Sequence, residues 1–248
     1  MCVVNLMWGC NLSVVGVDVG GSGVRSAVLH EDGTIGEITR ITLHDLSLDG
    51  VIRAVKCAIQ PYENVDVIGC GIPGFLSDEI LVSSPNLPAL DGINVSSALT
   101  EALELPVFVE NDANCAVVGG ARLSELNDLV VLTLGTGVGG GALINGRLLR
   151  GEGGLGAEFG HIFVGGDDRC ACGARGCIEA YASGTGLVRR ALEKGLCVST
   201  VQDLVVLADA NDPTAVAVFE RAGRALGQGI ATVINLLSPK EVWLAGGV

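Results

Sequence analysis

Two segments of the chain share one local pattern. Near the N-terminus, the apolar strand sequence SVVGVDV is followed by the glycine turn GGSG, and a second strand, VRSAVLH, leads to the turn signal Asp32-Gly33. Further along, DLVVLTL is followed by GTGVGGG, and the return strand GGALI leads to Asn145-Gly146. An internal duplication explains the repeated order. The chain is therefore expected to fold into two similar halves.

The sequence between the two copies alternates strands with helices. We expect helices near 48–60 and 96–102 and one that begins near Asp112, and strands at VDVIGCGIP and PVFVEN. Hairpins mixed with strand–helix crossovers predict an α/β fold, with two domains of sheet and flanking helices that face each other across a cleft. The expected domains are residues 1–112 and 113–248, with 1–12 an extension of unassigned role.

Composition indicates a globular enzyme. Of the 248 residues, 49% are hydrophobic and 4% aromatic, and 37 are glycines, as in α/β enzymes rich in tight turns. The formal net charge is −13 and the Lys and Arg residues are scattered, so we expect no nucleic-acid partner. The apolar N-terminus lacks the positive charges that begin a signal peptide. We expect a cytoplasmic protein without a membrane segment.

The turn DVGGSGVR has the composition of an anion-binding loop. Glycines remove Cβ atoms where a backbone approaches a ligand closely, and successive N–H groups can hold phosphate oxygens. Asp18, at the preceding strand end, could reach a magnesium ion on those phosphates. A hairpin without a ligand is the alternative, but the second turn, Gly135-Thr136-Gly137, favours a phosphate chain held by both turns. Neither turn has the Gly-Lys-[Ser/Thr] of a P-loop.

The predicted strand in VFVENDANC ends at two polar residues, Asn111 and Asp112. Phosphoryl transfer to an alcohol needs an oriented base near the attacking oxygen, and Asp112 could accept the proton of a substrate hydroxyl while Asn111 holds a neighbouring hydroxyl. The alternative is that one of the two side chains caps the following helix. The two roles are compatible.

Three cysteines lie close together in CACGARGCIEAYASG. Zinc prefers four tetrahedral nitrogen or sulfur ligands, and Cys170, Cys172 and Cys177 with His161 would make a closed structural site in a loop over 161–177. Incidental thiols are the alternative. The other cysteines are dispersed in apolar or strand-like segments, which predicts buried free thiols in a reducing compartment: Cys2, Cys10, Cys57, Cys70, Cys115 and Cys197.

Two acids accompany this loop. Glu158 precedes His161 by three residues, and Glu179 follows the last cysteine of the loop by two. Two carboxylates and an imidazole that converge on one pocket suit a polyhydroxylated ligand, because each buried hydroxyl needs a partner. The loop is therefore expected to brace a sugar site, although either acid could instead be a solvated helix residue.

The motifs DVGGSGVR, ENDAN, LGTGVGGG, GAEFGH, CACGARGCIEAYASG and VWLAGGV, taken in this order, closely resemble the ROK family of sugar kinases and repressors, within the actin-like ATPase superfamily. The resemblance covers about residues 14–248. It implies two ribonuclease-H-like domains, ATP and magnesium as cofactors, and transfer of the γ-phosphoryl group to a hydroxyl of a hexose or N-acylhexosamine, commonly the 6-hydroxyl. Many family members continue beyond Gly-Gly-Val in helices that close over the nucleotide, so we expect this chain to be a fragment.

The resemblance also implies residue roles. Phosphate contacts fall on Gly20, Gly21, Ser22, Gly135, Thr136 and Gly137, and adenosine contacts on Gly246 and Gly247. The base falls on Asp112, and sugar contacts on Gly74, Asn111, Glu158, His161 and Glu179. Structural zinc falls on His161, Cys170, Cys172 and Cys177. We expect a homodimer with a small sugar as its partner.

Glucose is the expected substrate, and an N-acetylhexosamine is the alternative. The loop SPNLPALDG lacks the Gly-Trp that many glucokinases of the family show after Leu-Pro, which could leave space for an acetamido group. A repressor of the family would carry a helix-turn-helix of roughly sixty or more residues before the first phosphate turn. Only 17 residues precede Asp18, so DNA binding is disfavoured. A polyphosphate-dependent glucokinase resembles DVGGSG but normally lacks the cysteine loop.

Overall fold

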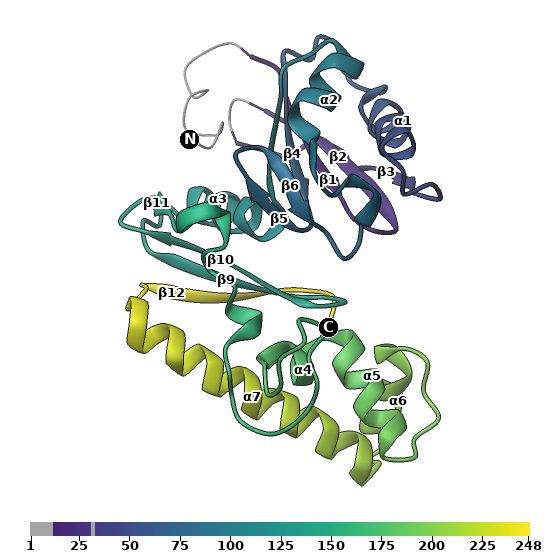
Figure 1. The fold of residues 1–248 in the computed structure, drawn as a ribbon, viewed down its shortest axis with the longest axis vertical. Helices are drawn as coiled ribbons and strands as arrows, with labels where there is room; N and C mark the ends of the chain where they lie inside the picture. Colours follow the sequence, from purple (N-terminus) through teal and green to yellow (C-terminus); the bar gives the residue numbers. More distant parts are fainter. Residues whose placement is uncertain (1–11, 31–32) are drawn as a thin grey trace. The chain divides into compact units, whose positions relative to one another are not determined.

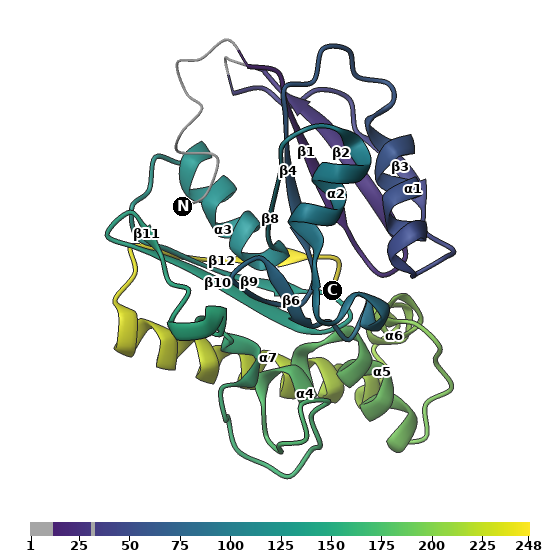
Figure 2. The same cartoon turned by 45° about the horizontal axis from the view of Figure 1, so that its top comes forward.

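The computed structural model describes residues 12–30 and 33–248 (Figures 1 and 2). The predicted extension at 1–12, apart from its last residue, lies outside the described residues, as do Asp32 of the first turn signal and the cysteines at positions 2 and 10. The chain forms two compact units. Unit 1 comprises the chain up to Cys115 together with Arg150–Leu155, and unit 2 comprises Ala116–Leu149 together with Gly156–Val248.

Unit 1 is built on a five-stranded sheet of order β3-β2-β1-β4-β8. Its strands are β1 (Val14–Val19), β2 (Gly23–Leu29), β3 (Thr39–Thr42), β4 (Val67–Ile72) and β8 (Val107–Asn111). The first three strands form an antiparallel meander, whereas β1, β4 and β8 run parallel to one another. The crossovers that parallel pairing requires are helices, as the sequence predicts.

Two helices cover the core of unit 1. Helix α1 (Leu48–Ile59) begins at Ser47, whose side chain accepts the N–H of Gly50, and α2 (Val95–Leu103) begins at Asn94, whose side chain accepts the N–H of Ser97. Their apolar faces pack with alternate valines of β1, namely Val15, Val17 and Val19. A small sheet joins β5 (Phe75–Ser77), β6 (Ile80–Ser83) and β7 (Ile93–Asn94), and the sequence analysis did not predict it.

Unit 2 repeats the strand order of unit 1 in a four-stranded sheet, β11-β10-β9-β12. The strands are β9 (Leu129–Leu134), β10 (Val138–Ile144), β11 (Arg147–Leu148) and β12 (Glu241–Gly246). As in unit 1, the first three strands, β9, β10 and β11, form an antiparallel meander, and β12 pairs in parallel with β9. This agreement supports the internal duplication inferred from the repeated sequence pattern.

Helices pack on both faces of the unit 2 sheet. Alternate residues of β9 point to opposite faces, so Leu129 and Val131 pack with α3 (Asp112–Leu123), while Val130 and Leu132 belong to the larger core formed with the other helices. These helices are α4 (Ile178–Ala182), α5 (Gly184–Glu193), α6 (Val201–Asp209) and α7 (Pro213–Leu237). Among the described residues, none of the helices combines the length and apolar character needed to span a membrane.

The structure corrects one expectation about the dispersed cysteines. Cys70 is buried in β4, but Cys57 and Cys197 are exposed and Cys115 is half-buried. The exposure of Cys57 follows from the amphipathic character of α1, because Cys57 lies on the solvent side of this helix while Val55 and Ala58 face the core. In the described part of the chain, the cysteines form no disulfide.

Candidate functional site

The predicted site residues of unit 1 lie at one edge of its sheet. Because β1, β4 and β8 are parallel, their carboxyl ends lie at the same edge. Asp18 and the first glycine turn stand at the end of β1, Gly74 follows β4, and Asp112 follows β8. The turn is closed by a hydrogen bond from Gly20 N–H to the Gly23 carbonyl, at 2.8 Å. The sheet therefore brings the predicted base and the first phosphate turn to one edge.

The side chain of Asn111 makes two hydrogen bonds. Its Nδ2 donates to the Gly74 carbonyl at 2.9 Å, and its Oδ1 accepts the N–H of Asn114 at 3.0 Å. The second contact caps the start of α3, so the capping interpretation is correct for this residue. The first contact links the ends of β4 and β8, the two segments from which the resemblance implies sugar contacts.

Asp112 is the first residue of α3, and its side chain is accessible to solvent. Its Oδ1 accepts the N–H of Ala113 at 2.8 Å. Partial desolvation by the surrounding protein raises the pKa of the Asp112 carboxyl. The hydrogen bond from Ala113 N–H opposes this shift, and the negative charge of Asp18 adds to it. A carboxylate with a raised pKa is a stronger proton acceptor, which suits a general base.

The raised pKa of Asp112 predicts the acid side of the pH profile. A base works in its ionised form, so kcat/KM for the sugar should rise with pH through the Asp112 pKa, with a midpoint above the ordinary value of 3.8. Measured pH–rate profiles, at pH values where circular dichroism shows folded protein, test this. Asp18→Asn removes the neighbouring negative charge and should move the midpoint down. A midpoint at or below 3.8 in the parent protein would contradict the prediction.

The second glycine turn lies in unit 2, at the carboxyl ends of the neighbouring strands β9 and β12. Gly135 N–H donates to the Gly137 carbonyl at 3.0 Å, which closes the turn. Gly247 N–H donates to the carbonyl of Leu134, the last residue of β9, also at 3.0 Å. The structure thus brings Gly246 and Gly247, predicted on the adenosine side, next to the predicted phosphate turn.

The start of α5 holds this second turn. Gly184 N–H donates to the Gly135 carbonyl at 2.8 Å, and Thr185 Oγ1 donates to the Thr136 carbonyl at 2.9 Å. Sequence reasoning missed both residues. The available signal was Ser183, which caps α5 by accepting the N–H of Gly186 and so marks a helix N-terminus, a common place for phosphate groups.

Glu179 joins the second turn to the cysteine loop. Its Oε2 accepts the N–H of Val138, immediately after the turn, at 3.0 Å, and its Oε1 lies 3.2 Å from Cys170 Sγ. A Cβ at Gly137 would lie 2.6 Å from Glu179 Oε2, so a larger residue there would displace the carboxylate. Glu179 is therefore not a solvated helix acid, since its carboxylate connects two predicted ligand-binding segments of unit 2.

The four predicted zinc ligands come together in unit 2. The ligand atoms of His161, Cys170, Cys172 and Cys177 all lie within 4.8 Å of one another. Cys172 Sγ is 3.8 Å from Cys177 Sγ, and Cys170 Sγ is 3.6 Å from His161 Nδ1. Two sulfurs bound to one tetrahedral zinc at about 2.3 Å lie roughly 3.8 Å apart. The donor set and its spacing therefore fit a zinc ion.

The thiols of this cluster differ in their surroundings. Burial raises the pKa values of Cys170 and Cys177, whereas a hydrogen bond from the Ala174 backbone N–H lowers that of the exposed Cys172. Two buried thiols side by side would ionise poorly without a cation, and a bound metal would favour their thiolate forms.

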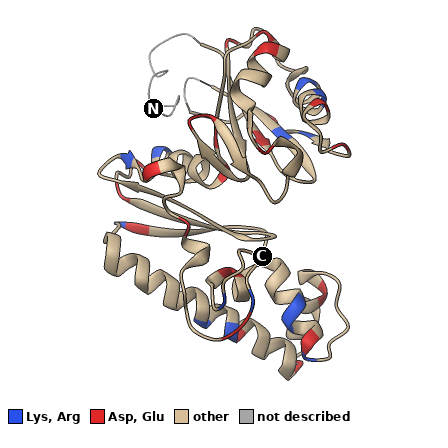
Figure 3. Ribbon diagram, viewed as in Figure 1, with Lys and Arg blue, Asp and Glu red and all other residues tan. Residues whose placement is uncertain are grey.

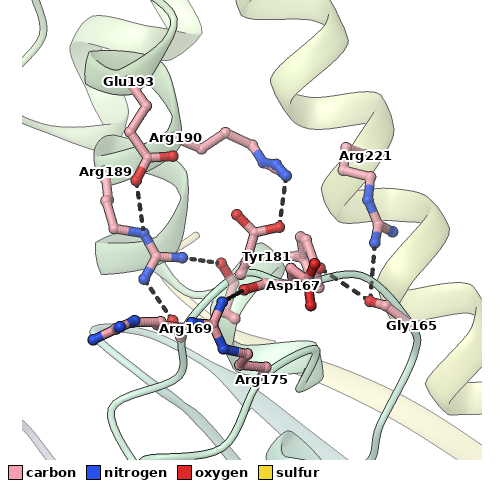
Figure 4. A network of polar contacts seen from close by, with 11 residues as sticks. Gly165, Asp167, Arg169, Arg175, Tyr181, Arg189, Arg190, Glu193 and Arg221 are labelled. Atoms are coloured by element: carbon pink, nitrogen blue, oxygen red, sulfur yellow. Dashed lines mark hydrogen bonds and ion pairs between the residues drawn. The ribbon is translucent and has the colours of Figure 1, made fainter.

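Polar contacts hold the cysteine loop to its helices without a metal (Figure 4). Tyr181 of α4 lies between two guanidinium groups, with Arg221 of α7 at 3.9 Å and Arg190 of α5 at 5.1 Å from the ring centre. Its hydroxyl donates to the Gly165 carbonyl at 3.0 Å. Arg190 also pairs with Asp168 at 2.8 Å, and both side chains are largely buried. Arg190 and Arg221 lie on helices that carry blue segments in Figure 3, and both side chains contact the loop.

Glu158 lies just before the short 3-10 helix Phe159–His161. Its backbone carbonyl accepts the N–H of His161 at 3.1 Å, so the two residues belong to one turn. The structure therefore gathers His161 and Glu179 at the cysteine cluster and places Glu158 directly before that cluster in the chain.

A family model described as the ROK family matches residues 14–248, and the chain belongs to this family. A glucokinase of Thermotoga maritima is 34% identical over 263 aligned positions, which cover 96% of this chain and 82% of that protein. An N-acetyl-D-glucosamine kinase of Shigella flexneri is 30% identical over 255 positions, which cover 94% of this chain and 83% of that protein.

Solved structures show the same fold. A ROK hexokinase from Thermus thermophilus superposes with a TM-score of 0.84 at 32% identity, covering 95% of this chain and 82% of that one. A ROK family glucokinase from Streptomyces griseus, in complex with glucose and AMPPNP, gives a TM-score of 0.81 at 31% identity, covering 95% of this chain and 83% of that one. The α/β fold expected from the motifs is therefore confirmed.

Proposed function

We propose that this protein is an ATP-dependent hexose kinase that phosphorylates glucose, at the 6-hydroxyl. One observation carries the proposal: Asp112 and the first glycine turn stand at the same edge of the unit 1 sheet, at the ends of parallel strands. A kinase needs a proton acceptor near the place where the terminal phosphate is presented. The glucokinases and the hexokinase among the relatives support the same activity.

In the proposed reaction, the sugar hydroxyl oxygen forms a bond to the γ-phosphorus while the bond from that phosphorus to the bridging oxygen of ADP breaks. Asp112 takes the hydroxyl proton, and ADP leaves with the electron pair of the broken bond. Magnesium, with Asp18 on its protein side, would neutralise charge on the phosphates. The nucleotide contacts we propose are Gly20, Gly21, Ser22, Gly135, Thr136, Gly137, Gly246 and Gly247.

We propose sugar contacts at Gly74, Asn111 and Asp112 in unit 1, and at Glu158, His161 and Glu179 in unit 2. Glu179 accepts the Val138 N–H through one oxygen, so its orientation is fixed before a sugar arrives. Preorganised acceptors and donors of this kind discriminate between sugars, because a missing hydroxyl leaves one of them unpaired.

A structural zinc ion completes the proposal. His161, Cys170, Cys172 and Cys177 would hold it, and the spacing of their ligand atoms supports this assignment. With four protein ligands the ion keeps no open position, so its part would be to fix the loop and the orientation of the His161 ring. We also propose a cytoplasmic homodimer, and the exposed Cys57 and Cys197, which form no disulfide, support a reducing compartment.

The substrate is tested by comparing sugars. A coupled ADP-release assay should compare glucose, N-acetylglucosamine, N-acetylmannosamine, mannose and fructose at equal concentrations, with ATP or polyphosphate as donor. We expect the highest kcat/KM with glucose and ATP. A value about tenfold higher for either N-acetyl sugar would make the protein an N-acetylhexosamine kinase, the alternative that the Shigella flexneri relative favours.

A further inference from the structure

Glu110 directly precedes Asn111 and Asp112 at the end of β8, and both oxygens of its carboxylate have partners. Oε1 accepts the backbone N–H of Asn111 and the Nδ2 of Asn114, each at 3.0 Å. Oε2 accepts from Arg150, with Nε at 3.0 Å and Nη2 at 2.6 Å. One carboxylate therefore connects the end of the strand, the first turn of α3 and an arginine that is distant in the sequence.

Arg150 belongs to the segment Arg150–Leu155, which returns to unit 1 after the strands β9, β10 and β11 of unit 2. The segment packs closely against β5 of unit 1. Gly154 has a φ of 76°, and a Cβ there would overlap the carbonyl oxygen of Leu76 in β5. This seating fixes the end of the segment and limits where the Arg150 side chain can reach.

The ion pair of Glu110 with Arg150 is less exposed than an ordinary surface pair. The side chain of Glu110 is 16% exposed and that of Arg150 is 37% exposed. The pair formed by Arg53 and Asp45 near α1 is 64% and 48% exposed, respectively. Exposed pairs contribute little to structure, whereas removing one partner of a shielded pair leaves a charge that must find new contacts.

We propose that Arg150, acting through Glu110, is a positioning residue for Asp112. The inference rests on the proposed function, in which Asp112 takes the proton from the sugar. With Arg150 in place, the Glu110 carboxylate holds the Asn111 N–H and the Asn114 side chain, and so sets the path of the chain on both sides of Asp112. Without Arg150, the carboxylate turns toward solvent and these two contacts are lost.

The test uses the full chain with Arg150→Ala, Arg150→Lys and the matched control Arg53→Ala. We expect Arg150→Ala to speed amide hydrogen exchange at Asn111 and Asn114. We also expect kcat to fall by about 100-fold, with little change in KM for ATP, because a displaced base affects the chemical step rather than nucleotide binding. Arg150→Lys, which keeps one charged donor, should recover part of kcat, and added guanidinium ion at millimolar concentration should partly restore Arg150→Ala.

Two results would overturn the proposal. One is unchanged exchange at Asn111 and Asn114 in Arg150→Ala, and the other is a kcat for Arg150→Ala equal to that of Arg53→Ala. A parent protein that transfers no phosphoryl group would instead refute the proposed function. In that case the exchange comparison still decides whether Arg150 orders the turn that carries Asp112.

Discussion

Asp112→Asn should reduce kcat by about 10²- to 10⁴-fold, the range that a general base contributes, while glucose still binds. The amide keeps the shape of the side chain and can still accept the Ala113 N–H, which Asp112 accepts at 2.8 Å, but it cannot take a proton. Steady-state kinetics give kcat, and isothermal titration of the variant with glucose gives the affinity.

A matched control for this change is Asp49→Asn. Asp49 is also an exposed acid in the first turn of a helix, α1, and none of the proposed contacts involves it. The control should keep the parent kcat. Turnover of Asp112→Asn within tenfold of the parent would show that another group takes the proton.

Removal of the metal should have the second large effect. Protein purified without chelator should contain about one zinc ion per chain, and Cys172→Ser should lose the metal together with most of its sugar affinity. The fold should remain, because the Tyr181 hydroxyl and the ion pair of Arg190 with Asp168 hold the loop independently of the ion. Elemental analysis, glucose titration and circular dichroism measure the three quantities.

Cys57→Ser is the control for the metal experiment, because this exposed thiol on α1 lies in unit 1, outside the ligand cluster. It should keep both zinc and sugar affinity. Metal-free protein with full glucose affinity would refute the bracing role of zinc, and unfolding of Cys172→Ser would show that the polar contacts of the loop do not suffice.

The strands around the two glycine turns could be predicted because their signals are local. Alternating or continuous apolar residues, a glycine turn and a hairpin signal such as Asn145-Gly146 determine the strand pairing within a short stretch of chain. Asn145 and Gly146 indeed have φ values of 51° and 69°, as a two-residue hairpin turn requires. The small sheet β5-β6-β7 was not predicted, because its strands are only two to four residues long and carry no clear periodicity.

The candidate site could be predicted in part, for a similar reason. The ligand cluster at His161 and the three cysteines was recognisable because the chemistry of zinc restricts the residue types and spacing. The contact of Glu179 with the Val138 N–H and the pairing of Arg150 with Glu110 were not recognisable. The two residues in each pair are distant in sequence, and a single sequence contains no information about which charged side chain reaches which partner.

The return of Arg150–Leu155 to unit 1 has a consequence for biosynthesis. A ribosome synthesises about 5–20 residues per second, and N-terminal domains generally fold first as they emerge. Here unit 1 lacks the segment Arg150–Leu155 until three strands of unit 2 have been synthesised. For a few seconds, therefore, the Glu110 carboxylate has no Arg150 to pair with. The nascent chain should therefore bind chaperones until Leu155 has left the exit tunnel, and a stop codon placed after Cys115 should give a protein that is degraded quickly.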